Sequence, residues 1–201
     1  MEEKKLQKRA IESREKLLEA AWKLFCAKGY FNTNTKEIAK TAGVSVGNFY
    51  NYYKDKSDIY YELAARYVDG SATAISDLGE MLLSETDARK VLKDYIVIQM
   101  SRAIDTGRFF SDCNVLVQDS EKLQNLFLDD TDKVIHNIEL LLEEIPSVVK
   151  RASYPVMARL LFTMIDNLSE DLCKVQNKEF YEEYQAQMIK VVQDYVFGEE
   201  K

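Results

Sequence analysis

Residues 45–56 are the part of this sequence best suited to contacting a nucleic acid. A carboxamide such as that of Asn48 can pair with two atoms on the edge of an adenine. Tyrosine hydroxyls and lysine ammonium groups can donate hydrogen bonds to phosphate oxygens, and Tyr50, Tyr52 and Lys56 follow Asn48 closely. These residue types and spacings predict contact with the bases and backbone of a duplex.

The charge distribution supports contact with a polyanion, although the net charge of the whole chain is −7. Residues 1–56 contain twelve Lys and Arg against seven Asp and Glu, a net charge of +5. Residues 57–201 contain fifteen against twenty-seven, a net charge of −12. We therefore expect the N-terminal end to meet the polyanion and the acidic remainder to be kept away from it.

Three helices are expected to position these residues. An amphipathic pattern predicts a first helix over 6–28, which Gly29 ends in the left-handed conformation. Two shorter helices are predicted over 35–42 and 46–52. Because only Gly43, Val44 and Ser45 separate them, the pair is typical of a helix-turn-helix unit.

Several single residues at the ends of the two short helices support the prediction of a helix-turn-helix unit. Asn34 is the expected N-cap of the first short helix, with Glu37 placed as in a capping box. Gly43 permits a positive φ at the turn, and Ser45 can satisfy the free amides of the second helix. Gly47 costs helix propensity, so we expect it to leave room for close approach to DNA. The expected small core consists of Ile38, Ala39, Ala42 and Val44.

The segment over residues 33–56 resembles the TetR family of bacterial transcriptional regulators. The resemblance covers about residues 11–60, and we extend the homology to about residue 71. Val46 departs from the polar residue that is common in the family, and Tyr53 and Ser57 replace a commoner Phe and Glu. The matching residues are Gly29-Tyr30, Thr33, Ile38-Ala39, Ala42-Gly43-Val44-Ser45, Gly47, Phe49-Tyr50, Tyr52-Tyr53 and Lys56.

The resemblance implies a set of DNA contacts. The helix over 46–52 would lie in the major groove as the recognition helix, with Asn48 on an adenine edge and Val46 against a thymine methyl group. The groove-facing residues would be Ser45, Val46, Gly47, Asn48 and Phe49. The phosphate contacts would be Thr35, Lys36, Tyr50, Tyr52 and Lys56.

Some residues in this region have a plainer interpretation. Tyr53 is better explained as core than as a DNA contact, and Tyr30 and Phe31 are also expected in the core. The charged run over 4–16 is equally compatible with a solvated helix face and with an arm that touches flanking DNA.

The rest of the chain also predicts helices, because only seven Gly and two Pro interrupt it. We expect an all-α protein with a three-helix DNA-binding domain over 1–56 and a helical effector-binding and dimerisation domain over 57–201. The helices predicted after residue 56 span about 56–82, 87–105, 108–118, 121–144, 153–174 and 178–197.

The resemblance also implies partners. It suggests a dimeric repressor that an unknown small-molecule effector releases from a palindromic operator in double-stranded DNA. The homodimer would form through the helices over 153–174 and 178–197, which carry wide apolar stripes. The candidate effector-binding residues, each of which also suits an ordinary helical core, are Met100, Phe109, Phe110, Cys113, Phe127, His136 and Phe162.

Other classes of protein find little support. The sequence has no run of eighteen apolar residues that predicts a membrane span and no secretion signal. The three cysteines at 26, 113 and 173 are far apart, which fits a reducing cytoplasm. Asp166, Glu170 and Asp171 are better explained as a solvated face than as a metal site, and no catalytic or cofactor-binding motif appears. Two alternatives stay open: an activator rather than a repressor, and a helical enzyme or carrier with a structural helix-turn-helix.

Overall fold

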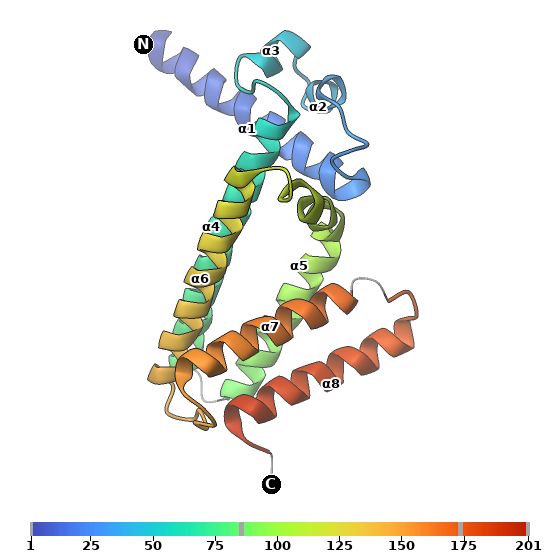
Figure 1. The fold of residues 1–201 in the computed structure, drawn as a ribbon. Helices are drawn as coiled ribbons and strands as arrows, with labels where there is room; N and C mark the ends of the chain where they lie inside the picture. The colour runs from blue at the N-terminus through green and yellow to red at the C-terminus, as the bar shows by residue number, and fades with distance from the viewer. Residues whose placement is uncertain (1, 85–86, 173–174, 200–201) are drawn as a thin grey trace. The chain divides into compact units, whose positions relative to one another are not determined.

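The computed structural model describes residues 2–84, 87–172 and 175–199, and all the regular elements in these ranges are helices (Figure 1). The all-α prediction is therefore confirmed. In chain order, the helices are α1 (Glu2–Lys28), α2 (Thr35–Thr41), α3 (Val46–Tyr50), α4 (Lys56–Ser84), α5 (Ala88–Leu116), α6 (Glu121–Glu144), α7 (Tyr154–Leu172) and α8 (Lys178–Phe197). The last two residues of the helix predicted over 153–174, including Cys173, lie outside the described ranges.

Side-chain caps fix where several of these helices begin. The Asn34 side chain accepts a hydrogen bond from the Glu37 amide at 3.0 Å, and Asn177 accepts one from the Phe180 amide at the same distance. Each cap satisfies an amide that has no partner within its own helix. The Glu37 side chain does not complete the capping box, because it pairs with Lys28 of α1 instead.

The predicted break at Gly107 is wrong. Helix α5 continues without interruption from Ala88 to Leu116, where the sequence predicted two helices. A glycine inside a helix costs only about 1 kcal/mol relative to alanine. Thr106 and Phe109 on either side of it are buried, and this packing is sufficient to offset a cost of that size.

The chain forms two compact units. The first unit contains the chain up to Tyr67 together with Thr106–Asn125, and the second contains Val68–Asp105 and the chain from Leu126 onwards. The first unit therefore includes a segment of α5 and α6 that lies far from the N-terminus in sequence. The predicted division at residue 56 followed chain order and stays a prediction.

Aromatic rings fill the core of the first unit. The Phe109 ring of α5 is fully buried and stacks on the Tyr60 ring of α4 with a centroid distance of 4.4 Å. The Tyr60 hydroxyl donates a hydrogen bond of 2.7 Å to the Phe109 carbonyl oxygen. The Phe25 ring of α1 packs edge-on against Tyr60 at 5.3 Å. These contacts join α1, α4 and the second half of α5.

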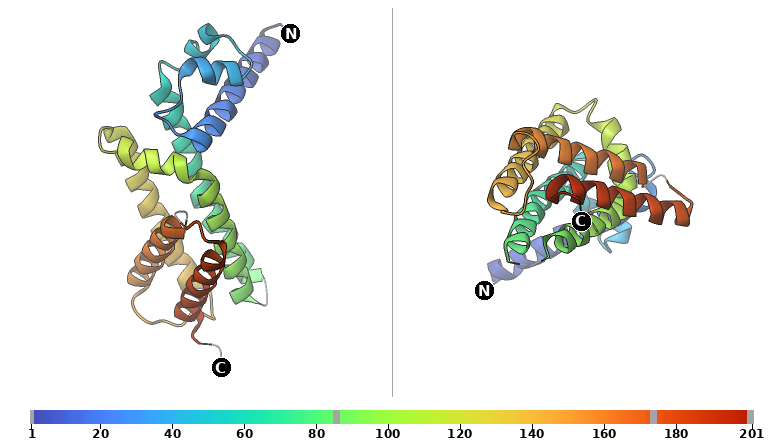
Figure 2. Two further views of the ribbon diagram at one scale, coloured as in Figure 1. Left: turned by 90° about the vertical axis from the view of Figure 1, so that its right-hand side faces the viewer. Right: turned by 90° about the horizontal axis from the view of Figure 1, so that it is seen from below.

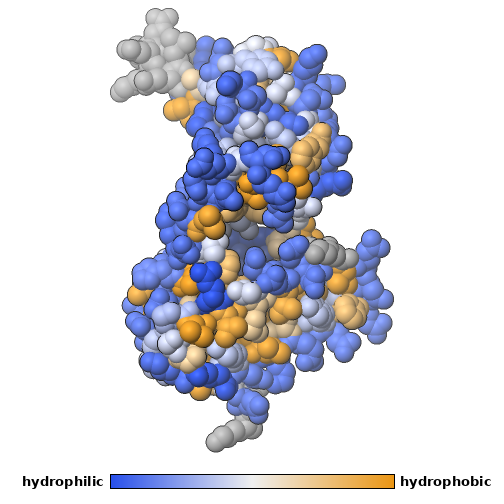
Figure 3. Space-filling view, in the orientation of Figure 1, coloured by the Kyte–Doolittle hydropathy of each residue, from blue (hydrophilic) through white to orange (hydrophobic). Residues whose placement is uncertain are grey.

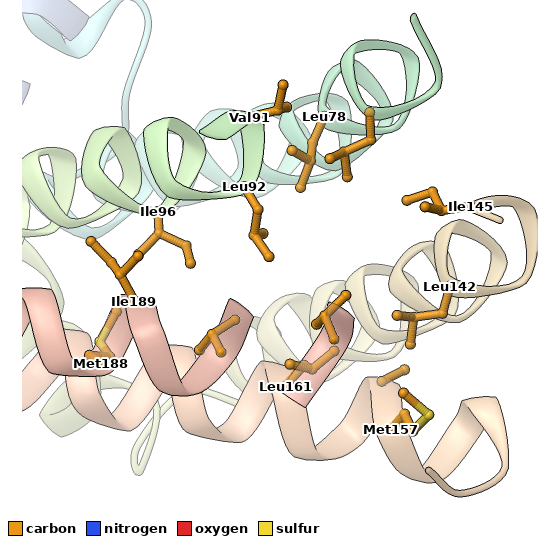
Figure 4. Close-up of a cluster of buried hydrophobic side chains, with 14 of the residues drawn as sticks. Leu78, Val91, Leu92, Ile96, Leu142, Ile145, Met157, Leu161, Met188 and Ile189 are labelled. Carbon is orange, nitrogen blue, oxygen red and sulfur yellow. The ribbon is translucent and has the colours of Figure 1, made fainter. Parts of the chain in front are cut away.

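Aliphatic side chains and methionines fill the core of the second unit (Figure 4). Ile96 of α5, Met157 of α7 and Val192 of α8 are almost completely buried there. Helices α7 and α8 lie side by side in both views of Figure 2. A small apolar cavity of about 60 Å³ lies in this unit, lined in part by Leu92 and Leu161.

Two classes of feature are not found among the described residues. None of the described helices has the length and apolar character needed to cross a membrane. Within the same ranges, no three His, Cys, Asp or Glu side chains gather as a metal site would require.

Candidate nucleic-acid interface

The turn between α2 and α3 has the geometry that the sequence predicted. Gly43 has a φ of +70°, which an L-residue with a side chain rarely adopts. The Val44 amide donates to the Ala39 carbonyl at 3.0 Å, and the Gly43 amide donates to the Lys40 carbonyl at 3.1 Å. These bonds end α2 and turn the chain into α3. Ile38 and Ala39 are fully buried beneath the turn, so the angle between the helices is fixed by packing.

Helix α3 begins at a serine cap and presents a polar surface. The Ser45 hydroxyl accepts a hydrogen bond of 3.1 Å from the Asn48 amide. Ser45 and Gly47 are exposed, and Val46 and Asn48 are partly exposed. The Asn48 side-chain oxygen accepts a long hydrogen bond of 3.4 Å from the Asn51 carboxamide. The Asn48 carboxamide is therefore accessible at the surface and only weakly engaged within the chain.

Phe49 requires a correction. It was expected among the groove-facing residues, but its side chain has 0% exposed surface. Its ring lies 5.7 Å from the ring of Tyr53, which is buried as predicted. Phe49 is the residue that anchors α3 in the core of the first unit, and it cannot reach a base.

Gly47 has open space around its α-carbon. A β-carbon built there would meet only the Ser45 hydroxyl, at 3.9 Å. Nothing in the described chain therefore requires glycine at this position. The expectation that Gly47 leaves room for something outside the chain is compatible with this geometry.

A second set of predicted contacts lies at the N-terminal end of α2. The Thr35 hydroxyl and the Tyr50 hydroxyl are 3.2 Å apart, although the residues come from different helices. Tyr50 is 54% exposed, Lys36 is exposed and Tyr52 is partly exposed. The structure thus brings Thr35 and Tyr50 together at one edge of the α2–α3 unit.

Lys56 has an internal role that the sequence analysis missed. Its Nζ donates hydrogen bonds to the carbonyl oxygens of Tyr30 at 2.7 Å and Thr33 at 2.9 Å. It also lies 3.9 Å from the centroid of the Tyr30 ring. Burial lowers the pKa of Lys56, and the Asp112 carboxylate acts in the opposite direction. Lys56 therefore holds the loop between α1 and α2, in addition to any contact with a phosphate.

Tyr30 and Phe31, the two aromatic residues of that loop that were expected in the core, differ in their burial. Tyr30 is partly buried, but Phe31 is 57% exposed, so the expectation that Phe31 belongs to the core is wrong. Phe31 follows Tyr30 directly, and the two rings meet at an interplanar angle of 90°. Only one of the two adjacent rings faces the core.

Ion pairs between α1 and α4 involve charged residues of both signs on α1. Arg14 pairs with Glu62 of α4 at 2.7 Å, and Glu62 also accepts a hydrogen bond from the Tyr53 hydroxyl at 3.0 Å. Arg66 forms a bidentate pair with Glu15, and this hydrogen bonding lowers the pKa of Glu15. The side chains of residues 4–7 in the charged run lie outside the described set.

The predicted effector-binding residues are divided between the two units. Phe109, Phe110 and Cys113 belong to the first unit, and the other four belong to the second. His136 has a side chain that is 65% exposed, and its place in a pocket stays a prediction. The cavity in the second unit is lined by other residues. Helical spacing alone did not indicate which apolar side chains face that cavity.

The two helices predicted for dimerisation carry exposed apolar side chains. Val156 and Leu160 of α7 are 50% and 45% exposed, and Val191 of α8 is 51% exposed. Figure 3 shows apolar side chains on the face of the second unit where α7 lies. Large exposed aliphatic side chains of this kind are typical of surfaces that become covered by another protein.

The sequence and fold are similar to those of known regulators. Residues 17–63 match the family model for bacterial regulatory proteins of the tetR family. An HTH-type transcriptional regulator from Staphylococcus aureus is 33% identical over 92 residues, which are 46% of this chain and 50% of the relative. The chain thus spans about half the length of the curated relatives that it matches.

Solved structures with low sequence identity share the fold. A putative TetR-family regulator from Mesorhizobium loti has a TM-score of 0.75 and 14% identity, covering 94% of this chain and 98% of its own. A putative transcriptional regulator from Saccharomonospora viridis, solved in complex with choline, has a TM-score of 0.76 and 20% identity. It covers 92% of this chain and 97% of its own.

Proposed function

Because the chain belongs to the TetR family of bacterial regulatory proteins, we propose that it is a sequence-specific DNA-binding repressor. In this proposal a dimer binds a palindromic operator, and a small-molecule effector releases it. An action on bacterial DNA would place the protein in the cytoplasm. Its matched relatives carry the names of regulators, and we infer no catalytic activity.

One observation carries the proposal. Helix α3 is capped by Ser45, anchored through Phe49 and accessible along its Ser45–Asn48 side. A short helix that is fixed on one face and presents Ser45, Val46 and Asn48 on the other suits direct reading of base edges in the major groove. The family match over residues 17–63 includes the whole of this unit.

We propose different tasks for the two groups of exposed residues. In our proposal Ser45, Val46 and Asn48 contact base edges, and Gly47 allows the helix to approach closely. Thr35, Lys36, Tyr50 and Tyr52 contact phosphates, which set affinity and register without reading sequence. Lys56 is a further candidate for a phosphate contact, although two of its three N–H groups are used within the chain.

The test is a fluorescence-anisotropy titration with the DNA upstream of the protein's own gene and with scrambled DNA of the same length. We expect tighter binding to the upstream DNA and a linear fall of the logarithm of the association constant with the logarithm of salt concentration. Equal, salt-insensitive or absent binding to both DNAs would contradict the proposal and favour a helical enzyme or carrier.

A dimer is needed because one helix-turn-helix unit contacts only a single half-site. We propose that α7 and α8 form the interface, as the exposed Val156, Leu160 and Val191 suggest. Leu160→Glu should yield a monomer in sedimentation velocity and weaken binding to a full operator much more than to one half-site. A Leu160→Glu variant that stays dimeric would exclude this interface.

The effector site is the least constrained part of the proposal. The cavity in the second unit has a lining of apolar and aromatic side chains, including Leu92, Tyr95 and Phe197. An effector would act by binding more tightly to the form with low DNA affinity. Thermal-shift screening should find a compound that stabilises the protein and also weakens operator binding. A compound that stabilises without affecting DNA binding would not be the effector.

A further inference from the structure

A carboxylate far away in sequence holds the loop that leads into α2. Oδ2 of Asp112, on α5, accepts a hydrogen bond of 2.5 Å from the Tyr30 amide, which is 82 positions away in sequence. Gly29 has a φ of +88°, and a β-carbon at this position would overlap Oδ2 of Asp112. The backbone at Gly29 therefore approaches the carboxylate more closely than any other residue type would allow.

The position of Asp112 is itself fixed by packing. Asp112 lies one turn after Phe109, whose buried ring stacks on Tyr60 and whose carbonyl oxygen accepts from the Tyr60 hydroxyl. Cys113, the next residue, is also buried. The carboxylate thus extends from a well-anchored part of α5 and is not a mobile surface group.

The same loop is held from its other side by Lys56. The Tyr30 amide donates to Asp112, and the Tyr30 carbonyl oxygen accepts from Lys56. The backbone N–H and C=O groups of Tyr30 are therefore both hydrogen-bonded to charged side chains. Such charge-assisted hydrogen bonds are stronger than neutral ones. The Thr33 hydroxyl closes the loop by donating to the Gly29 carbonyl oxygen at 2.7 Å.

Few residues separate this held loop from the surface proposed to contact DNA. The chain passes from Tyr30 to the Asn34 cap and directly into Thr35, the first residue of α2. The Thr35 hydroxyl in turn contacts Tyr50 of α3. A displacement of Tyr30 would be transmitted to the proposed phosphate contacts because so little chain is free to absorb it.

We propose that Asp112 is a positioning residue for DNA binding, although it lies on α5, outside the helix-turn-helix unit. This inference rests on the proposed function. Its carboxylate fixes the Gly29–Asn34 loop and thereby the N-terminal end of α2. Because the carboxylate belongs to α5 and not to α2 or α3, its loss should weaken binding to the operator without removing a proposed phosphate contact.

Two substitutions of Asp112 distinguish the loss of its hydrogen-bond acceptor from the loss of its negative charge. Asp112→Ala removes the acceptor, whereas Asp112→Asn retains an oxygen that can accept from the Tyr30 amide. The control is Asp105→Ala, which removes an exposed carboxylate from the same helix. For each variant we would measure operator affinity, the salt slope and the active fraction by stoichiometric titration, together with hydrogen exchange of the Tyr30 amide.

The expected result is a loss of about tenfold in operator affinity for Asp112→Ala, with an unchanged salt slope and a full active fraction. Its Tyr30 amide should exchange faster than in the unmodified protein. The operator affinity of Asp112→Asn should stay within about threefold of that of the unmodified protein. The affinity of Asp105→Ala should equal that of the unmodified protein. If Asp112→Ala does not fold, Asp112→Ser replaces it, because the shorter side chain cannot reach the amide.

Several outcomes would overturn the inference. Unchanged affinity in Asp112→Ala would exclude a positioning role, and so would an equal loss in Asp105→Ala. A reduced active fraction with an unchanged dissociation constant would identify a purely structural role. Failure of the unmodified protein to bind its upstream DNA would instead contradict the proposed function, so the two failures can be distinguished.

Discussion

Each of the two compact units is stabilised internally by a different kind of contact. In the first unit, directional contacts between charged or polar groups fix the loops, as Lys56 and Asp112 do at Tyr30. In the second unit, a broad apolar core joins α5, α7 and α8 around residues such as Ile96 and Met157. The first arrangement holds a few surface groups in place, which reading a DNA groove requires. The second depends on the volume of its apolar side chains and tolerates changes that conserve that volume.

This difference predicts where substitutions will affect DNA binding directly. Hydrogen bonds depend steeply on distance and angle, so the first unit should respond to the loss of single groups. An apolar core tolerates changes that conserve volume, so the second unit should respond mainly to lost volume. The predictions below follow from this contrast, in order of decreasing effect.

The largest effect is expected for Phe49→Ala. Removing this fully buried ring should lower the free energy of unfolding by about 3–5 kcal/mol and abolish operator binding. Urea denaturation and anisotropy titration measure both effects. Ile96→Ala in the second unit is the matched control, because it should destabilise the protein while the folded fraction still binds DNA. A stable Phe49→Ala variant would contradict the burial of this ring.

The next effect is expected for Lys56→Met. The substitution removes two hydrogen bonds to carbonyl oxygens and should cost roughly 1.5–3 kcal/mol of stability. If the role of Lys56 is internal, the salt slope of DNA binding stays unchanged. A slope reduced by about one unit without loss of stability would identify a phosphate contact instead. Lys36→Met, at an exposed position on α2, provides the comparison.

Asn48→Ala should affect specificity rather than stability. Loss of a bidentate contact with a base should cost about 1–3 kcal/mol in operator binding. Binding to scrambled DNA and the melting temperature should change little, because the one side-chain hydrogen bond of Asn48 in the described part of the chain is long, at 3.4 Å. Competition titrations against both DNAs give the specificity ratio. An equal loss on both DNAs would argue against base reading by Asn48.

The smallest effect is expected in the second unit, at Asp130 of α6. Burial raises the pKa of Asp130 from 3.8 to about 6, and its Oδ1 has no hydrogen-bond partner in the described part of the chain. The folded form therefore holds the proton more tightly than the unfolded form. Stability should fall as the pH rises from about 4 to 6, and the penalty should persist above that range.

Asp130→Asn should accordingly raise stability at pH 7.5 by roughly 0.5–1 kcal/mol and leave it almost unchanged near pH 4. Thermal unfolding at the two pH values measures the difference. Asp129→Asn changes an exposed neighbour and should have no such effect. Equal behaviour of the two variants would contradict the burial of Asp130.

The features that the sequence predicted well are those that depend on short stretches of chain. The caps at Asn34 and Ser45 involve residues three positions apart. The positive φ of Gly43 is likewise a local requirement of the turn. Such signals can be recognised in a single sequence because both partners lie within one turn of helix.

The features that were missed depend on distant contacts. The continuity of α5 through Gly107 depends on tertiary packing, and the Tyr30–Asp112 contact joins residues 82 positions apart. The position of Phe49 could have been inferred. A short helix must bury an apolar side chain to pack against its neighbours, and Phe49 is the largest fully apolar side chain in α3.

The central claim is that the exposed side of α3 faces DNA, and substitutions at two glycines test it most directly. A β-carbon at Gly47 or at Gly70 on α4 would meet almost no other atom of the chain, so Gly47→Glu and Gly70→Glu should both fold with unchanged or slightly raised stability. We predict that Gly47→Glu reduces operator affinity by about a hundredfold or more, whereas Gly70→Glu binds like the unmodified protein. A Gly47→Glu variant that is folded and binds the operator normally would contradict the account.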